Sequence, residues 1–297
     1  MTFISVKYIQ TNDFTATLLY LRLYWGFLAF YFFFRIWKLK NAEFIFMFCA
    51  YLTLTEFIAI RIYPNLTNIL PNYDGTFEDN FIASGFFGGV HSFGGNRTVT
   101  GVLMLSIYVY FDTNREIFSK RNRYIAGLAS LLAFSTTAWL IFIVYLLSKH
   151  VRSLIFPIVL ALMAGVIIYV STFWSRLTWE YISAVYEFKA DEIAKNMSHL
   201  YADRLSLFFG TSYVESESNE VKGYGMLVGD FSYLDFYLRN GVVGVIIFIM
   251  ISLANINRYN LPILVVLIIG TFHYHVIFSF PGQIIFAYFL TIRTEDN

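Results

Sequence analysis

The sequence has few charged residues, few prolines and almost no cysteine. Only 14% of its 297 residues are charged, whereas a soluble domain needs about 25% to solvate its surface. Cys49, the only cysteine, lies in an apolar run, which excludes disulfides and thiolate metal sites. The net charge of +1 gives no case for nucleic acid as a partner. Residues 1–13 lack the basic start and small-residue cleavage site of a signal peptide, so we expect a retained polar segment.

Common catalytic and cofactor motifs are also missing. The sequence contains no HExxH, Walker, GxSxG or dinucleotide-binding pattern. His273 and His275 are two residues apart, a spacing that puts them on different faces of a helix and disfavours a shared metal. We therefore expect neither a metal nor a cofactor.

Apolar and aromatic residues dominate what is present. Hydrophobic residues make up 58% of the chain and aromatic ones 20%, in stretches of about 15–25 residues, the length that crosses a hydrocarbon core. Because backbone groups in lipid must be satisfied within the segment, such stretches are helices. The sequence thus predicts an all-α polytopic integral membrane protein, with a single membrane domain over residues 1–297. The candidate spans are residues 15–34, 44–62, 98–111, 124–147, 153–174, 231–254 and 261–292.

The connections between these spans are of two kinds. Three short ones are basic, and they cover residues 35–40, 115–123 and 149–152. Two long ones, residues 63–97 and 175–230, are richer in acid, and the second contains a plausible helix over residues 177–206. The positive-inside rule places the short links in the cytoplasm and allows residues 63–97 and 175–230 to form a first and a large outer loop.

Residues 124–147 have basic clusters at both ends, which one crossing cannot leave on the same side. A helical hairpin that turns at Ser135-Thr136-Thr137 would restore the parity, although its arms of about 12 residues, roughly 18 Å each, are short. The alternative is one full crossing that departs from the charge rule. Pro281-Gly282 divides residues 261–292 into a full span and a short one. We expect eight or nine spans in total.

Two groups of polar residues in the outer regions are candidates for chemistry. Arg97, Arg176 and Arg204 suit a diphosphate ligand, because guanidinium pairs bidentately with phosphate oxygens, although ordinary loop solvation would also explain them. Asp230 lies at the start of a membrane helix and is either a helix cap or a general base.

A second acidic residue follows Asp230 on the same predicted helix. Asp235 and Arg239 stand four residues apart, so they can pair on one helix face. Ionisable groups at membrane depth usually face the interior of the helix bundle. We therefore expect this pair to lie inside the protein.

The order of these motifs resembles that of the Wzy-type polysaccharide polymerase and O-antigen ligase family of bacterial envelope proteins. The resemblance covers roughly residues 85–292. It comprises Gly94-Gly95-Asn96-Arg97 before a span, a serine-containing hairpin, a large outer loop, and Gly229-Asp230-x-x-Tyr233-Leu234 followed by Gly241-x-x-Gly244. The motifs are loose, and their order and spacing carry more weight than any single match.

The resemblance implies a glycosyltransferase that needs no metal. Its substrate would be an oligosaccharide on undecaprenyl diphosphate, at the periplasmic or extracellular face of the bacterial inner membrane, in the biosynthesis of O-antigen lipopolysaccharide or capsule. Asp230 would be the catalytic residue, while Arg204, Arg97, Arg176 and Tyr233 would bind the diphosphate and glycan. Membrane lipid and a chain-length regulator protein are the other partners that it implies.

The chain departs from the family pattern in three ways. Ligases typically have His-Asn where this chain has Asp230-Phe231, which favours a polymerase over a ligase. Ser135 is followed by Thr136 where the family often has arginine, and the chain is short for the family. Three alternatives stay open: an O-antigen ligase, a polyprenyl-phosphate-sugar glycosyltransferase that uses Glu78 and Asp79, and a glycolipid transporter.

Overall fold

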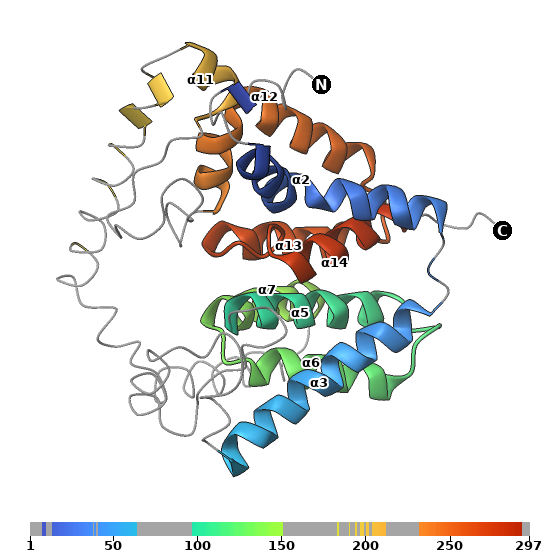
Figure 1. Cartoon of the computed structure of the whole chain (residues 1–297). Helices are drawn as coiled ribbons and strands as arrows, with labels where there is room; N and C mark the ends of the chain where they lie inside the picture. The colour runs from blue at the N-terminus through green and yellow to red at the C-terminus, as the bar shows by residue number, and fades with distance from the viewer. Residues whose placement is uncertain are drawn as a thin grey trace. The chain divides into compact units, whose positions relative to one another are not determined.

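The computed structural model in Figure 1 describes residues 8–9, 14–37, 39, 41–63, 97–150, 183, 190, 194, 197–198, 200–201, 204–211 and 232–292. Within these ranges the chain is all-α and has no strand, which confirms the predicted secondary-structure class. The helices are α2 (Phe14–Ile36), α3 (Ala42–Ile62), α5 (Arg97–Thr113), α6 (Lys120–Leu132), α7 (Thr136–His150), α11 (Arg204–Phe209), α12 (Ser232–Ala254), α13 (Leu261–His273) and α14 (Phe280–Thr291).

Four of these helices match predicted spans closely. The expected spans at residues 15–34, 44–62, 98–111 and 231–254 correspond to α2, α3, α5 and α12. Of the described helices, α3 and α12 are long and apolar enough to cross a membrane, and α7, α13 and α14 are shorter apolar helices. The span predicted at 153–174, and most of the two predicted outer loops, lie outside the described residues.

The side chains of α12 are sorted in the opposite sense to those of a soluble helix. Met250 and Leu253 are 64% and 63% exposed, whereas Asp235 and Arg239 are 0% and 3% exposed. Phe44 on α3 is likewise exposed. Apolar residues that face outward and charges that face inward are what a hydrocarbon solvent favours.

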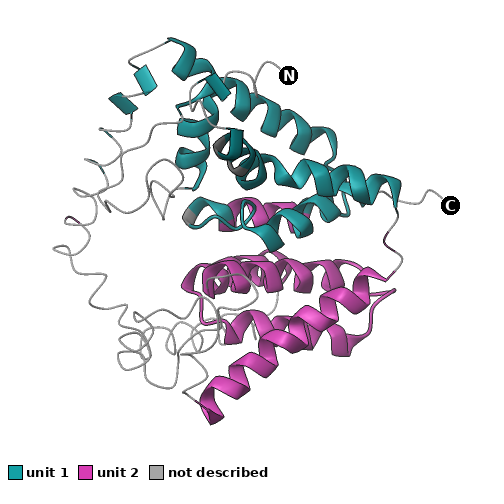
Figure 2. Ribbon diagram, in the orientation of Figure 1, with its two compact units in different colours: residues 1–38, 184–261, 271–297 teal, residues 39–183, 262–270 magenta. Residues whose placement is uncertain are grey.

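The chain divides into two compact units, coloured separately in Figure 2. Unit 1 comprises residues 1–38, 184–261 and 271–297, and unit 2 comprises residues 39–183 and 262–270. Unit 1 has an aromatic core, in which Phe236 stacks on Phe278 with ring centroids 5.0 Å apart. Phe27 and Phe248 both contact Phe286 from neighbouring helices. This core joins α2, α12 and α14.

In unit 2, α6 and α7 pack on α5 as the two arms of a hairpin. Ser130 on α6 donates a 2.9 Å hydrogen bond to the Gly101 carbonyl near the start of α5. A Cβ at Gly101 would lie 2.9 Å from the Ala138 Cβ on α7, so only glycine allows this approach. At the other end of α5, Arg123 of α6 and Lys149 of α7 both reach Asp112. The predicted division of residues 124–147 into two helices joined by a turn is therefore confirmed, and the membrane topology of this hairpin stays a prediction.

The turn of the hairpin forms at residues 133–135, where Phe134 adopts a φ of 50°. Ser135 follows directly and accepts a 3.2 Å hydrogen bond from the Ala138 backbone amide, so it caps α7. The turn therefore ends at Ser135, the first residue of the predicted polar triplet.

The division of the C-terminal run differs from the prediction. The break covers residues 274–279, and it leaves two short helices of 13 and 12 residues, where a full span and a short one were expected. Pro281 lies in the first turn of α14, where the missing N–H of proline costs nothing. Ser279 ends the break as the N-cap, and its side chain accepts from the Gly282 amide. Proline therefore starts α14 and does not interrupt α13.

The hairpin makes a testable prediction about topology. In a Cys49→Ser background, Ser119→Cys and Ser148→Cys place one thiol at each exposed end of the hairpin. Because both ends meet at Asp112, we expect a membrane-impermeant maleimide to label both only in inside-out vesicles. Labelling of the two positions from opposite sides of the membrane would contradict the hairpin.

Candidate functional site

A buried polar cluster lies in unit 1, which we call the Asp235 cluster: Tyr20, Tyr24, Trp25, Asp235, Arg239, Asn240 and His275. The Arg239 Nε lies 3.1 Å from Asp235 Oδ1, which confirms the pairing predicted from their spacing. The Tyr24 hydroxyl donates to Asp235 Oδ2, and His275 Nε2 lies 3.4 Å from the same oxygen. The carboxylate thus contacts α2, α12 and the turn after α13.

Asn240 extends the cluster one helical turn further. Its Oδ1 accepts a 2.7 Å hydrogen bond from Trp25 Nε1 and another from the Tyr20 hydroxyl. Its amide nitrogen donates to the Phe236 carbonyl at 2.8 Å. Tyr20 and Tyr24 are four residues apart, so one face of α2 presents both hydroxyls to α12.

The cluster combines a charge pair with a buried imidazole. Asp235 and Arg239 together carry no net charge, and His275 is 1% exposed. His275 Nδ1 has no hydrogen-bond partner among the described residues, and neither does the buried Ser232 Oγ. A buried polar atom without a partner costs roughly 1–3 kcal/mol. We therefore expect ordered water beside these two atoms.

Gly241 of the motif marks the place where α11 meets α12. Gly241 has a φ of 62°, and a Cβ there would lie 2.4 Å from the Phe208 carbonyl oxygen at the end of α11. The Thr211 amide donates a 2.8 Å hydrogen bond to the Leu238 carbonyl. The helix that begins at Arg204 is therefore fixed to α12, which contains Tyr233 and Leu234 of the motif.

The predicted site residues fall in different places. Arg204 is exposed at the start of α11 and Tyr233 lies in the first turn of α12, so two of them lie on helices that contact each other within unit 1. Tyr233 packs against Phe272, with ring centroids 5.1 Å apart. Arg97 begins α5, in unit 2. Asp230 and Arg176 lie outside the described residues.

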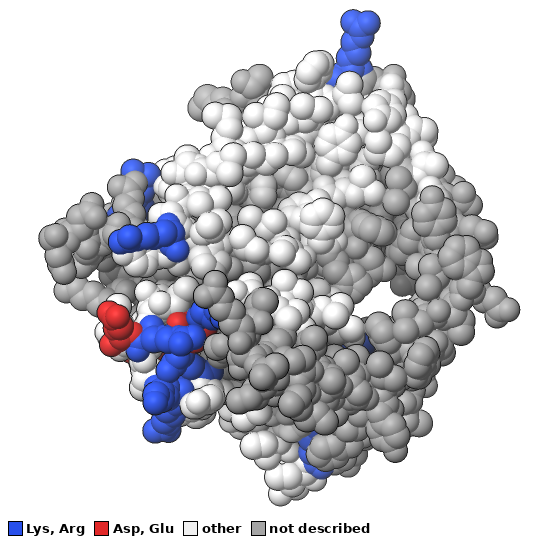
Figure 3. Space-filling model, turned by 180° about the vertical axis from the view of Figure 1, so that it is seen from behind, with Lys and Arg blue, Asp and Glu red and all other residues white. Residues whose placement is uncertain are grey.

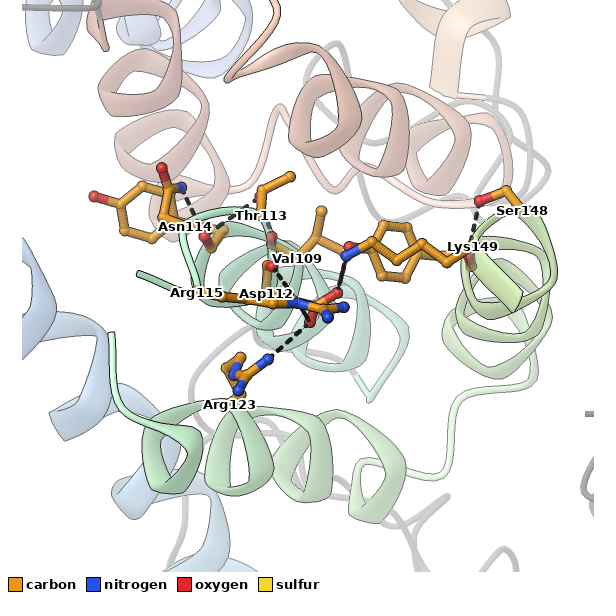
Figure 4. Close-up of polar contacts among 10 residues, drawn as sticks. Val109, Asp112, Thr113, Asn114, Arg115, Arg123, Ser148 and Lys149 are labelled. Atoms are coloured by element: carbon orange, nitrogen blue, oxygen red, sulfur yellow. Dashed lines mark hydrogen bonds and ion pairs between the residues drawn. The ribbon is translucent and has the colours of Figure 1, made fainter. Parts of the chain in front are cut away.

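A second charged cluster, in unit 2, surrounds Asp112 at the end of α5. Figure 4 shows Arg115, Arg123 and Lys149 pointing toward its carboxylate from three directions. The Arg115 Nε lies 2.9 Å from Asp112 Oδ1, and the Arg123 Nη1 lies 3.3 Å from the same oxygen. The Tyr145 hydroxyl lies 2.7 Å from Asp112 Oδ2, which Lys149 also contacts.

Asp112 lies just past the predicted span of residues 98–111. Burial opposes its ionisation, but hydrogen bonds from Lys149, Tyr145 and Arg115 lower its pKa to about 2. The bond to Asp112 in turn raises the pKa of Arg115. Asp112 is therefore ionised at neutral pH, and it joins the basic ends of α6 and α7 to α5.

Several of these residues were not predicted from the sequence. Tyr20, Tyr24 and Trp25 gave no signal, because aromatic residues on an apolar helix have the same appearance whether they face lipid or a buried carboxylate. His275 was considered only as a metal ligand. No group of three or more metal-ligating side chains occurs in the described part of the chain.

The Asp235–Arg239 pair makes a prediction about stability. Arg239→Leu leaves a buried carboxylate without its charge partner, and we expect a loss of about 3–5 kcal/mol. The double variant Asp235→Leu/Arg239→Leu removes both charges, so its loss should be smaller than the sum of the single losses by roughly 2 kcal/mol or more. Unfolding in detergent of purified Arg239→Leu, Asp235→Leu and the double variant measures the three losses. A double-variant loss equal to the sum of the single losses would contradict a direct pair.

The Gly241 crossing makes a separate prediction. Gly241→Ala combines a strained positive φ with a backbone contact, so we expect a loss of about 2 kcal/mol or more. Gly127→Ala is the matched control, because its nearest neighbour is a Tyr108 ring atom at 3.1 Å, which a small side-chain shift relieves. Equal unfolding temperatures for the two variants would contradict the crossing.

Comparisons with protein-family models, with curated protein sequences and with solved structures found no significant match to this chain.

Proposed function

We propose that this chain is a polysaccharide polymerase of the bacterial inner membrane, with eight or nine spans and its active face on the outer side. It transfers a glycan from an undecaprenyl diphosphate carrier to another lipid-linked repeat unit of O-antigen or capsule. The observation that carries the proposal is the contact between α11 and α12. This contact links the exposed Arg204 to the helix of the Gly-Asp-x-x-Tyr-Leu pattern, through the pattern's own Gly241.

The reaction needs a cation for the leaving group and an acceptor for one proton. An acceptor hydroxyl attacks the anomeric carbon, the bond from that carbon to the diphosphate oxygen breaks, and the carrier diphosphate leaves with its electron pair. Arg204 neutralises this diphosphate, so no metal is required. Asp230 accepts the hydroxyl proton, and Tyr233 contacts the glycan.

The Asp235 cluster has a positioning role in this proposal. Asp235 is fully buried, so it holds the first turns of α12 against α2 without contacting substrate. Alignment of two large reactants depends on such rigid support, because a displacement of about 1 Å from the productive geometry costs about 10²-fold in rate.

A glycolipid transporter is the second candidate. Transporters place ionisable groups and discontinuous helices at membrane depth. Here α12 is kinked at Gly241 and the run after residue 261 is broken at residues 274–279. These observations are also compatible with a polymerase, so glycan analysis has to separate the two functions.

Glycan length in a deletion strain tests the proposal. If the chain is a polymerase, the strain should carry single repeat units capped on lipid, with surface glycan otherwise present. Loss of surface glycan with accumulation of lipid-linked polymer would indicate a ligase, and loss with trapped single units inside the cell would indicate a transporter. Normal chain length would contradict the proposal.

Complementation of that strain tests the residues. We expect Arg204→Ala and Asp230→Ala to reduce polymer about 10²-fold or more, because each removes an interaction made with developing charge or a moving proton. Arg258→Ala is the matched control, an exposed arginine in the turn after α12 that we assign no role in catalysis. Glu78→Ala and Asp79→Ala should also restore polymer, and their failure would favour the polyprenyl-phosphate-sugar mechanism instead.

A further inference from the structure

A patch of basic side chains lies at the ends of α5, α6 and α7 in unit 2. We call it the basic patch, and it consists of Arg115, Lys120, Arg121, Arg123 and Lys149. In the lower left of Figure 3, lysine and arginine side chains lie together with acidic ones on the surface. The nearby carboxylates are Asp112, Glu116 and Glu43, which accepts from Asn122. Five cations against three carboxylates leave a surplus of two positive charges in this part of unit 2.

Several nitrogen donors in the basic patch are unused. Among the described residues, Arg115 donates only through its Nε, to Asp112, and its side chain is 49% exposed, so both terminal nitrogens are open to a ligand. The Arg123 Nε is buried and has no partner among the described residues. Planar guanidinium groups with free donors bind phosphate oxygens bidentately. The patch therefore offers the donors that a phosphate group requires.

The start of α6 adds to the positive field. Its first turn contains Lys120, Arg121 and Arg123 and no acidic residue. The N-terminus of a helix is already the positive end of its dipole, where cations are unfavourable and an anion is stabilising. Ser119 satisfies only the Asn122 amide there. A bound anion would therefore offset the unfavourable position of these cations at the N-terminus of α6.

Apolar side chains border the basic patch and show what kind of anion fits. Ile117 is 76% exposed and Tyr124 is 74% exposed. Leu128 is also exposed and lies one turn after Tyr124, on the same face of α6. A free phosphate ion would gain nothing from these residues. A phospholipid would place its headgroup on the cations and its acyl chains along this apolar face.

We propose that the basic patch binds the phosphate headgroup of an acidic membrane phospholipid, on the predicted cytoplasmic side of the membrane. The lipid bridges α5, α6 and α7 by supplying negative charge that the three nearby carboxylates do not provide. The lipid-binding proposal depends on the membrane location of the chain but not on polymerase activity. Lipid binding and polymerase activity are therefore able to fail independently of each other.

The test measures thermal stabilisation of the purified full chain in a zwitterionic detergent. Phosphatidylglycerol, phosphatidylcholine and inorganic phosphate are each titrated. We expect phosphatidylglycerol to raise the unfolding temperature in a saturable way, and the other two to have little effect. Arg115→Gln/Lys120→Gln should weaken the apparent affinity for phosphatidylglycerol about 5-fold for each cation removed. Asp112 keeps Arg123 and Lys149 in this double variant, so the fold should persist.

Arg35→Gln/Arg258→Gln is the matched control, because it removes two exposed arginines that lie outside the basic patch. Its affinity for phosphatidylglycerol should equal that of the unmodified chain. Equal stabilisation by phosphatidylcholine, equal stabilisation by inorganic phosphate, or equal weakening in both double variants would each overturn the proposal. If the test variant fails to fold, the three titrations of the unmodified chain still decide between these outcomes.

Discussion

The Asp235 carboxylate joins parts of unit 1 that lie far apart in the sequence. It pairs with Arg239 on its own helix, accepts from Tyr24 on α2, and contacts His275 after α13. In a medium that cannot solvate a charge, a carboxylate is tolerated only if fixed partners surround it. Positions of α2, α12 and the turn at residue 275 are therefore coupled, because moving any one of them would leave a buried charge without a partner. The aromatic core around Phe236 then packs on this fixed arrangement.

Unit 2 follows the same rule at its predicted cytoplasmic end. Asp112 is the acceptor for three cations, of which Arg115 precedes the hairpin and Arg123 and Lys149 lie on its two arms. The two carboxylates differ in the number of cations around them. Asp235 pairs with one arginine, whereas Asp112 contacts two arginines and one lysine. A balanced pair stabilises a fold by itself. The surplus around Asp112 leaves donors available for a ligand, which is why we place a lipid headgroup there and not in unit 1.

Local patterns predicted part of this structure well. The spacing of Asp235 and Arg239 predicted their contact, and charge parity predicted the hairpin near Ser135. The first prediction depends on spacing within one helix, and the second depends on the balance of charge across a span. Both properties can be read directly from the sequence. The prediction for Pro281 was wrong, because proline is compatible with the first turn of a helix and the Ser279 cap decides where α14 begins.

Contacts between distant segments could not be predicted in the same way. Tyr24 and Asp235 are 211 residues apart, and no spacing rule applies to such a pair. Gly241 was recognised only as part of a motif, whereas its positive φ arises from the close approach of α11. For the candidate site, the sequence predicted that Arg204 and Tyr233 lie on helices, and the structure shows that these helices, α11 and α12, contact each other. Asp230 and Arg176 lie outside the described residues.

The central claim is that this chain alone joins lipid-linked repeat units. The most direct measurement is reconstitution of the purified chain in liposomes with an undecaprenyl-diphosphate-linked repeat unit as the only substrate. We expect glycans of several repeat units on the carrier, together with released undecaprenyl diphosphate, in the absence of added metal. Recovery of the substrate as single repeat units, with the protein folded and inserted, would contradict it.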